Sequence, residues 1–202
     1  MTDAPNSPVP ARKHATASLR RLIAAAMDLE RRTLHVYCMF ESQFSDREAL
    51  RAFWFDMAQH ESRHFGALAL VAGLLESAST RRVRAGAALT PHRIQHLRRL
   101  LTRLTTEAQK GVSLERAFEI ALDIESSEIE DVVLDLLQAL KGEAERERAV
   151  KLLIHDLGDL SYMIEKHTSS RALLARADAL LEQQVHRLRL SVARRKRAAA
   201  HT

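Results

Sequence analysis

The chain has 202 residues and a formal net charge of +5 at pH 7; 46% of its residues are hydrophobic, and it contains a single cysteine. This composition predicts one domain with a sizeable core, and it excludes an internal disulfide and a cysteine-rich metal or iron–sulfur site within one chain. No apolar run approaches the roughly 20 residues that span a bilayer. The first ten residues are polar and proline-rich, without the apolar segment of a signal peptide, so we expect a soluble cytoplasmic protein with no membrane partner.

Good helix formers dominate, and no long stretch alternates with period two, so we predict an all-α protein. Residues 1–14 are expected to form a disordered arm. A first helix is expected over about 15–44, and a second runs to about residue 76. Ser45 offers its N-cap and Glu48 closes a capping box. The short turn between these two helices predicts an antiparallel hairpin.

The remaining helices follow a polar connection over about 77–90. Thr90 and Pro91 start a helix that ends at Gly111, and its many arginines indicate an outer crossover helix. Ser113 is the expected N-cap of a helix that runs to about residue 141. A further helix is expected over about 143–167, and a last one follows a cap at Ser169 or Ser170. The predicted organisation is therefore an arm over 1–14, a helical bundle over 15–167, and a C-terminal helix with a basic tail over 168–202.

A repeat with an offset of 95 residues relates the two halves of this bundle. It pairs Glu30 with Glu125, Glu61 with Asp156, and His64 with Asp159, and the surrounding apolar residues move with the same offset. At 100° per residue, the acids lie on the apolar faces of their helices, although Asp159 lies only at an edge. Glu128 lies on the same side as Glu125, whereas His60 flanks the face as an expected surface or supporting residue.

Buried carboxylates need a compensating partner, because an unpaired buried charge costs several kcal/mol. No lysine or arginine lies on the central line of these faces. Three solutions are open: bound metal, shared protons, or a helix arrangement that exposes the acids. Carboxylates with an imidazole favour iron or manganese, with zinc a further option.

Glu on one helix and Glu-x-x-His on the next, repeated in two hairpins, resembles the ferritin-like di-iron carboxylate proteins. Glu30 with Tyr37 seven residues later, followed by Ala58–His64 (AQHESRH), is similar to the rubrerythrin and erythrin branch. The second hairpin matches in part, since its fourth helix has Asp156 and Asp159 in place of Glu-x-x-His. The resemblance covers about residues 15–167 and implies a four-helix bundle of two hairpins with a crossover helix and an extra C-terminal helix.

This resemblance implies a non-haem site for two iron or manganese ions, or for one. Glu30 and Glu125 take terminal or bridging roles, Glu61 bridges, and His64 binds one ion. Asp156 and Asp159 stand where a second Glu and His are expected, and Glu128 is a further candidate ligand. Tyr37 is either a hydrogen-bond donor to the site or a core aromatic residue.

The implied activity is a ferroxidase, or an oxidoreductase that reacts with peroxide or O₂ at Glu30, Glu61, His64, Glu125 and Tyr37. The chain lacks the four cysteines of the rubredoxin-like site of rubrerythrins, so electrons come from an external donor or directly from Fe(II). The alternative is a catalytically degenerate bundle that binds metal or serves as a structural or interaction protein. Whether the chain is an enzyme therefore stays open.

The partners are inferred from the C-terminal part of the chain. Erythrin-type bundles often form homodimers, and Leu173, Leu180 and Leu181 offer an outer apolar face for such contact. Most of the excess positive charge lies between Arg187 and Arg197, so a nucleic-acid partner is not expected from the body of the chain. The tail is a solvated end, a contact for an anionic surface, or a docking peptide faintly similar to those of ferritin-like proteins in encapsulin shells.

Overall fold

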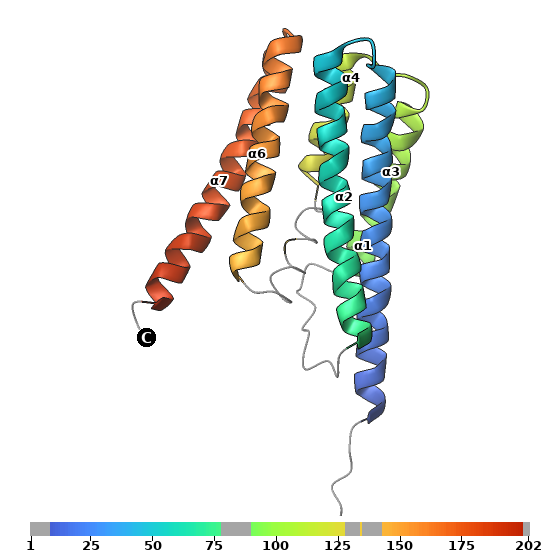
Figure 1. The fold of residues 1–202 in the computed structure, drawn as a ribbon, viewed down its shortest axis with the longest axis vertical. Coiled ribbons are helices and arrows are strands. Elements are labelled where there is room, and N and C mark those ends of the chain that lie inside the picture. Colours follow the sequence, from blue (N-terminus) through green and yellow to red (C-terminus); the bar gives the residue numbers. More distant parts are fainter. Residues whose placement is uncertain (1–8, 78–89, 128–133, 135–142, 200–202) are drawn as a thin grey trace, which may run out of the picture.

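A computed structural model of the chain describes residues 9–77, 90–127, 134 and 143–199 (Figure 1). Within these ranges the elements are all helices and no strand occurs, which confirms the all-α prediction. The helices are α1 (Val9–Gln43), α2 (Glu48–Ser77), α3 (Pro91–Ala108), α4 (Leu114–Glu125), α6 (Glu143–His167) and α7 (Arg171–Ala199).

Among the described helices, α1 and α2 form the most extensively packed pair. Near its turn, the buried Trp54 ring contacts the rings of Phe53, Phe40 and Phe118 at centroid distances of 4.7, 4.9 and 5.4 Å. Phe118 belongs to α4, so this aromatic cluster joins α4 to the first hairpin. Aromatic side chains bury large apolar areas, and this cluster forms one end of the core.

The first two helices differ from the prediction at their starts. α1 begins at Val9, inside the expected arm, because a proline at position 10 is tolerated in a first helical turn and good helix formers follow it. α2 begins at Glu48, so Ser45 lies in the preceding turn and is not its N-cap. The carbonyl of Arg47 instead accepts the first helical hydrogen bond, from the Arg51 amide over 2.9 Å.

The predicted starts of α3 and α4 are confirmed. The side chain of Thr90 accepts from the Arg93 amide, and that of Ser113 accepts from the Arg116 amide, each over 3.2 Å. Between the helices, Gly111 has a φ of 76°, a conformation that favours glycine. α3 packs against α1 and buries Ile94, Leu97, Leu101, Leu104 and Ala108.

The predicted continuous helix over about 113–141 is wrong, because α4 ends at Glu125. The Ser126 amide still donates to Leu122, but the Ser127 amide donates to Ile124 in a tighter turn. Consecutive serines weaken a helix because their hydroxyls compete for backbone groups. The candidate ligand Glu128 lies outside the described residues.

α6 packs most extensively on α7, and this pair stands beside α2 and α4 (Figure 1). The sequence instead paired the helix over 143–167 with the one that starts at residue 113, and α4 and α6 make only a small contact. The predicted range 143–167 is confirmed, and the Ser170 hydroxyl accepts from the Leu173 amide over 3.4 Å. Leu173 and Leu180 are buried, and α7 packs mainly against α6. The expected outer apolar face of Leu173, Leu180 and Leu181 is therefore wrong for its first two members, which pack inside the chain, while Leu181 is half-buried.

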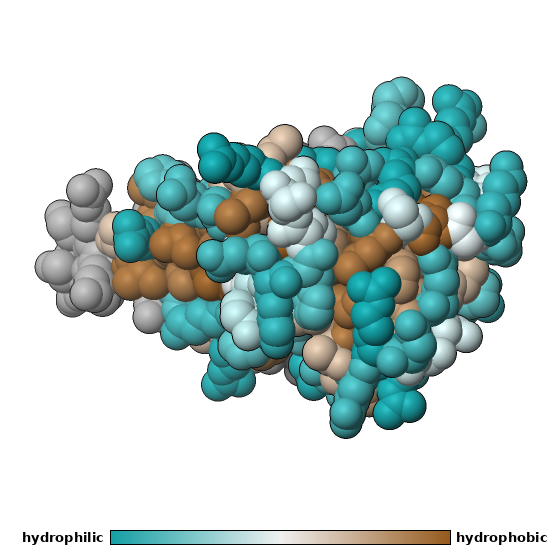
Figure 2. Space-filling model, turned by 90° about the horizontal axis from the view of Figure 1, so that it is seen from above, coloured by the Kyte–Doolittle hydropathy of each residue, from teal (hydrophilic) through white to brown (hydrophobic). Residues whose placement is uncertain are grey.

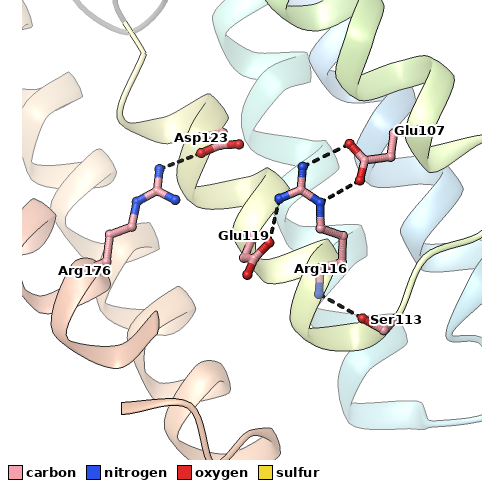
Figure 3. A network of polar contacts seen from close by, with 6 residues as sticks. All are labelled: Glu107, Ser113, Arg116, Glu119, Asp123 and Arg176. Carbon is pink, nitrogen blue, oxygen red and sulfur yellow. Dashed lines mark hydrogen bonds and ion pairs between the residues drawn. The ribbon is translucent and has the colours of Figure 1, made fainter. Parts of the chain in front are cut away.

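Ion pairs connect α4 to helices on both sides of it (Figure 3). Arg116 of α4 contacts both carboxylate oxygens of Glu107 on α3, over 2.6 and 2.9 Å. Arg176 of α7 donates to Asp123 of α4 over 2.7 Å. These contacts lie at part-buried or exposed positions and set the register of α4 against its neighbours.

The surface seen along the long axis is largely hydrophilic, with smaller hydrophobic areas between the charged side chains (Figure 2). In the part of the chain that the structure describes, the large exposed hydrophobic residues are Phe55, Leu70, Leu152, Tyr162 and Leu190. Among the described helices, none combines the length and apolar character needed to cross a bilayer.

Candidate metal centre

Three of the predicted ligands lie together where α1 faces α2. Glu30 comes from α1, and Glu61 and His64 come from adjacent turns of one face of α2. Each offers a ligand atom, and these atoms all lie within 4.8 Å of one another, so this group could hold a metal ion. Both carboxylates are buried, and His64 is half-buried.

The imidazole lies between the two acids. Its Nδ1 is 3.6 Å from Glu30 Oε2 and 3.7 Å from Glu61 Oε2. Both distances exceed hydrogen-bonding length. They are nevertheless short enough for all three residues to offer an atom to one small cation.

The electrostatics of the group favour such a cation. Burial, and next the neighbouring Glu30 carboxylate, raise the pKa of Glu61 to about 8, while His64 acts in the opposite direction. Two carboxylates in a dry site cannot both ionise cheaply, because desolvation and repulsion act together. A bound cation removes both penalties, so the chemistry of this donor set fits a metal ion.

Glu125 is not a member of this group, and it contacts Tyr37. The Tyr37 hydroxyl donates to Glu125 Oε1 over 2.7 Å, and both side chains are buried. The Tyr37 ring also stacks on Trp54, with ring centroids 6.0 Å apart. Tyr37 is therefore a core aromatic residue, and its hydroxyl donates to Glu125, which lies outside the group of Glu30, Glu61 and His64.

The two aspartates of α6, Asp156 and Asp159, lie beside histidines that the sequence did not predict as their partners. Asp156 is buried, with Oδ2 2.5 Å from His60 Nδ1 and Oδ1 3.4 Å from His155 Nδ1. Asp159 has a side chain that is 59% exposed and lies 3.3 Å from His155. These residues line a pocket of about 480 Å³ between α2 and α6, with Met57, Leu152 and Met163 among its apolar walls.

The sequence predicted His60 only as a surface or supporting residue, whereas the structure pairs it with the buried Asp156. His60 immediately precedes Glu61 and is therefore rotated about 100° from it around α2. That rotation turns His60 toward α6 and away from Glu30. Only the position of α6 makes His60 a partner of a buried aspartate, so periodicity within one helix could not reveal it.

Within the described part of the chain, Glu30, Glu61 and His64 form the group of metal-binding type. Glu125 and Asp156 contribute no atom to that group, and Asp159 lies at the surface beside His155. No protein-family model, curated protein or solved structure matches the chain. Its function therefore has to be inferred from the residue motifs and from this geometry.

Proposed function

We propose that this protein is a ferritin-like metal–carboxylate protein that binds iron or manganese through Glu30, Glu61 and His64. The observation that carries the proposal is the burial of two glutamates against one imidazole, with ligand atoms within 4.8 Å of each other. A metal ion offsets the desolvation cost that otherwise keeps Glu61 protonated at neutral pH.

The donor set supports this choice of metal. Two carboxylates and one imidazole suit hard or borderline ions, whereas soft ions prefer thiolates. The chain's one cysteine, Cys38, is exposed, so it cannot convert this buried group into a thiolate site. A bound iron or manganese ion supplies redox chemistry toward O₂ or peroxide. Oxidation of Fe(II) as a substrate is the reaction class that we propose.

Each side chain at or near this group has a distinct role. Glu30 and Glu61 supply the negative charge, and His64 supplies a nitrogen donor on the side that is partly open to solvent. Tyr37 holds Glu125 by a hydrogen bond, and His60 holds Asp156. Because neither Glu125 nor Asp156 contributes an atom to the group of Glu30, Glu61 and His64, we expect one ion per chain.

A second candidate function is favoured by the contacts of Asp156. Its oxygens lie beside His60 and His155, and it contributes no atom to the group of Glu30, Glu61 and His64. This arrangement supports a chain that binds metal for structural purposes without catalysing oxidation. Both candidates bind metal through the same three residues, and only the first catalyses the oxidation of Fe(II).

Metal content and Fe(II) oxidation test both candidates. The wild type, Glu61→Gln and the control Glu147→Gln are purified from medium that contains iron and manganese, and their metal is measured by mass spectrometry. Glu147 is also a buried glutamate, but it lies on α6 outside the group. We expect about one ion per chain in the wild type and control, and strong depletion in Glu61→Gln.

The outcomes separate the proposals. Metal binding together with Fe(II) oxidation that is lost in Glu61→Gln supports the ferroxidase. Metal binding without accelerated oxidation supports the second candidate. About two ions per chain, both lost in the variant, extend the site toward Glu125 and Asp156. Absence of metal from all three proteins overturns the metal proposal itself.

A further inference from the structure

A basic groove runs along the outer side of α3, where this helix packs on α1. It has a volume of about 690 Å³, and five cationic side chains line it: Arg32 from α1, and Arg98, Arg99, Arg103 and Lys110 from α3 and the turn after it. These cations occur along about 20 Å of the helix axis, at 1.5 Å per residue. The groove is distinct from the proposed metal group, which lies where α1 faces α2.

The cations of the groove are only partly neutralised by acids. Asp28 forms ion pairs with Arg32 at 3.0 Å and with Arg98 at 3.6 Å. Glu107, the acid in the lining, has both carboxylate oxygens bound to Arg116, which holds the pKa of Glu107 below its usual range. Among the described residues, Arg99, Arg103 and Lys110 make no ion pair, and all three are exposed.

The threonine hydroxyls of the groove already donate to the backbone, so a ligand mainly meets other donors. The Thr102 and Thr106 hydroxyls donate to the carbonyls of Arg98 and Thr102, each over 2.8 Å. Apart from the side-chain amide of Gln95, guanidinium and ammonium groups therefore supply the side-chain donors in this groove. Arginine pairs well with the oxygens of phosphate, and lysine acts as a point charge.

We propose that this groove binds a linear phosphate-rich anion, namely inorganic polyphosphate. One phosphate is satisfied by one or two cations, whereas the charges here continue over several helical turns. The described residues that line the groove include no aromatic side chain, so they lack the stacking platform typical of sites for single-stranded nucleic acid. A chain of phosphates without bases matches both features.

Binding of a labelled short polyphosphate, measured by fluorescence anisotropy at several salt concentrations, tests the proposal. The variant Arg99→Gln/Arg103→Gln/Lys110→Gln removes the cations that lack ion pairs. We expect its affinity to fall on the order of tenfold or more, and the slope of log K against log salt to decrease by about one for each cation that no longer meets a phosphate. Circular dichroism is expected to stay unchanged, because all three side chains are exposed.

The matched control, Arg194→Gln/Arg195→Gln/Lys196→Gln, removes the same charge from the basic C-terminal end. We expect it to bind polyphosphate like the wild type. An equal loss in the control, or none in the groove variant, overturns the proposal. Tighter binding of single-stranded DNA with the same number of phosphates, also lost in the groove variant, overturns the choice of polyphosphate. The assay uses no added metal, so its result is independent of the metal group.

Discussion

The Tyr37 hydroxyl on α1 donates a hydrogen bond to Oε1 of Glu125, the last residue of α4, over 2.7 Å. The two residues are 88 positions apart in the chain, and both side chains are buried. The bond therefore fixes the end of α4 against the first hairpin, beside the aromatic cluster around Trp54. It also holds a carboxylate that the sequence predicts as a metal ligand.

Replacement of Tyr37 by Phe removes this hydrogen bond and keeps the ring. We expect a loss of about 1–3 kcal/mol in the free energy of unfolding, because Glu125 then loses a buried hydrogen-bond donor. Urea denaturation measures the change. The control Tyr162→Phe alters an exposed tyrosine and should leave stability unchanged. Equal stability of Tyr37→Phe and wild type would show that the bond contributes little.

The stability of the metal-free protein should depend on pH through Glu61. Its pKa is raised from 4.5 to about 8 in the folded state, so between these values the folded protein holds a proton that the unfolded chain has lost. Stability therefore falls as pH rises through this window, by at most about 1.4 kcal/mol per pH unit from this group. Below pH 4.5 the contribution is fully present.

Thermal melts of wild type and Glu61→Gln across this window check the sign and the residue. The wild type should lose stability relative to Glu61→Gln as pH rises, since glutamine cannot ionise. Added iron or manganese should reverse the trend in the wild type, because metal binding requires deprotonated carboxylates. Parallel pH profiles of the two metal-free proteins would contradict the prediction.

The pair of His60 and Asp156 should stabilise the packing of α2 on α6. Replacement of His60 by Ala leaves the buried Asp156 without its neighbour at 2.5 Å. We expect a loss of about 1–3 kcal/mol in stability, the cost of leaving a buried polar group poorly satisfied. His155 touches the same aspartate, but its side chain is 74% exposed, so His155→Ala should have little effect. Guanidinium denaturation compares the two, and equal losses would refute the distinction.

The contacts of Arg116 offer a test of surface electrostatics (Figure 3). Its guanidinium binds Glu107 through two hydrogen bonds and Glu119 through a third, over 2.5 Å. Because the group is one-third exposed, Arg116→Met should lower stability by no more than about 1 kcal/mol. Glu119→Gln should cost less, as it leaves the paired contact intact. Measurements of unfolding free energy at low and high salt should show that the stability lost in each variant decreases as the salt concentration rises.

Much of the helical layout was predictable from residues close to each other in the chain. The caps at Thr90 and Ser113 and the range of α6 depend on local chemistry, and the structure confirms them. The end of α4 was missed because a pair of serines weakens a helix without forbidding it. Whether such a helix continues depends on what its next turn can pack against.

The grouping of Glu30 with Glu61 and His64 also follows from local information. Helical periodicity places Glu61 and His64 on one face, and a short turn makes that face meet α1. The contacts of Glu125 and Asp156 did not follow, although the repeat predicts that they join the same site. Their neighbours, Tyr37 and His60, come from other helices.

The sequence by itself therefore determined the all-helical class, the caps at Thr90 and Ser113, and the grouping of Glu30, Glu61 and His64, because each depends on residues close in the chain or across one short turn. The tertiary structure alone decided which residues the acidic side chains of α6 contact. In the folded chain, Asp156 lies beside His60, and Leu173 and Leu180 are buried. A groove lined by arginines runs along α3. These outcomes depend on packing between distant helices, which no local period encodes.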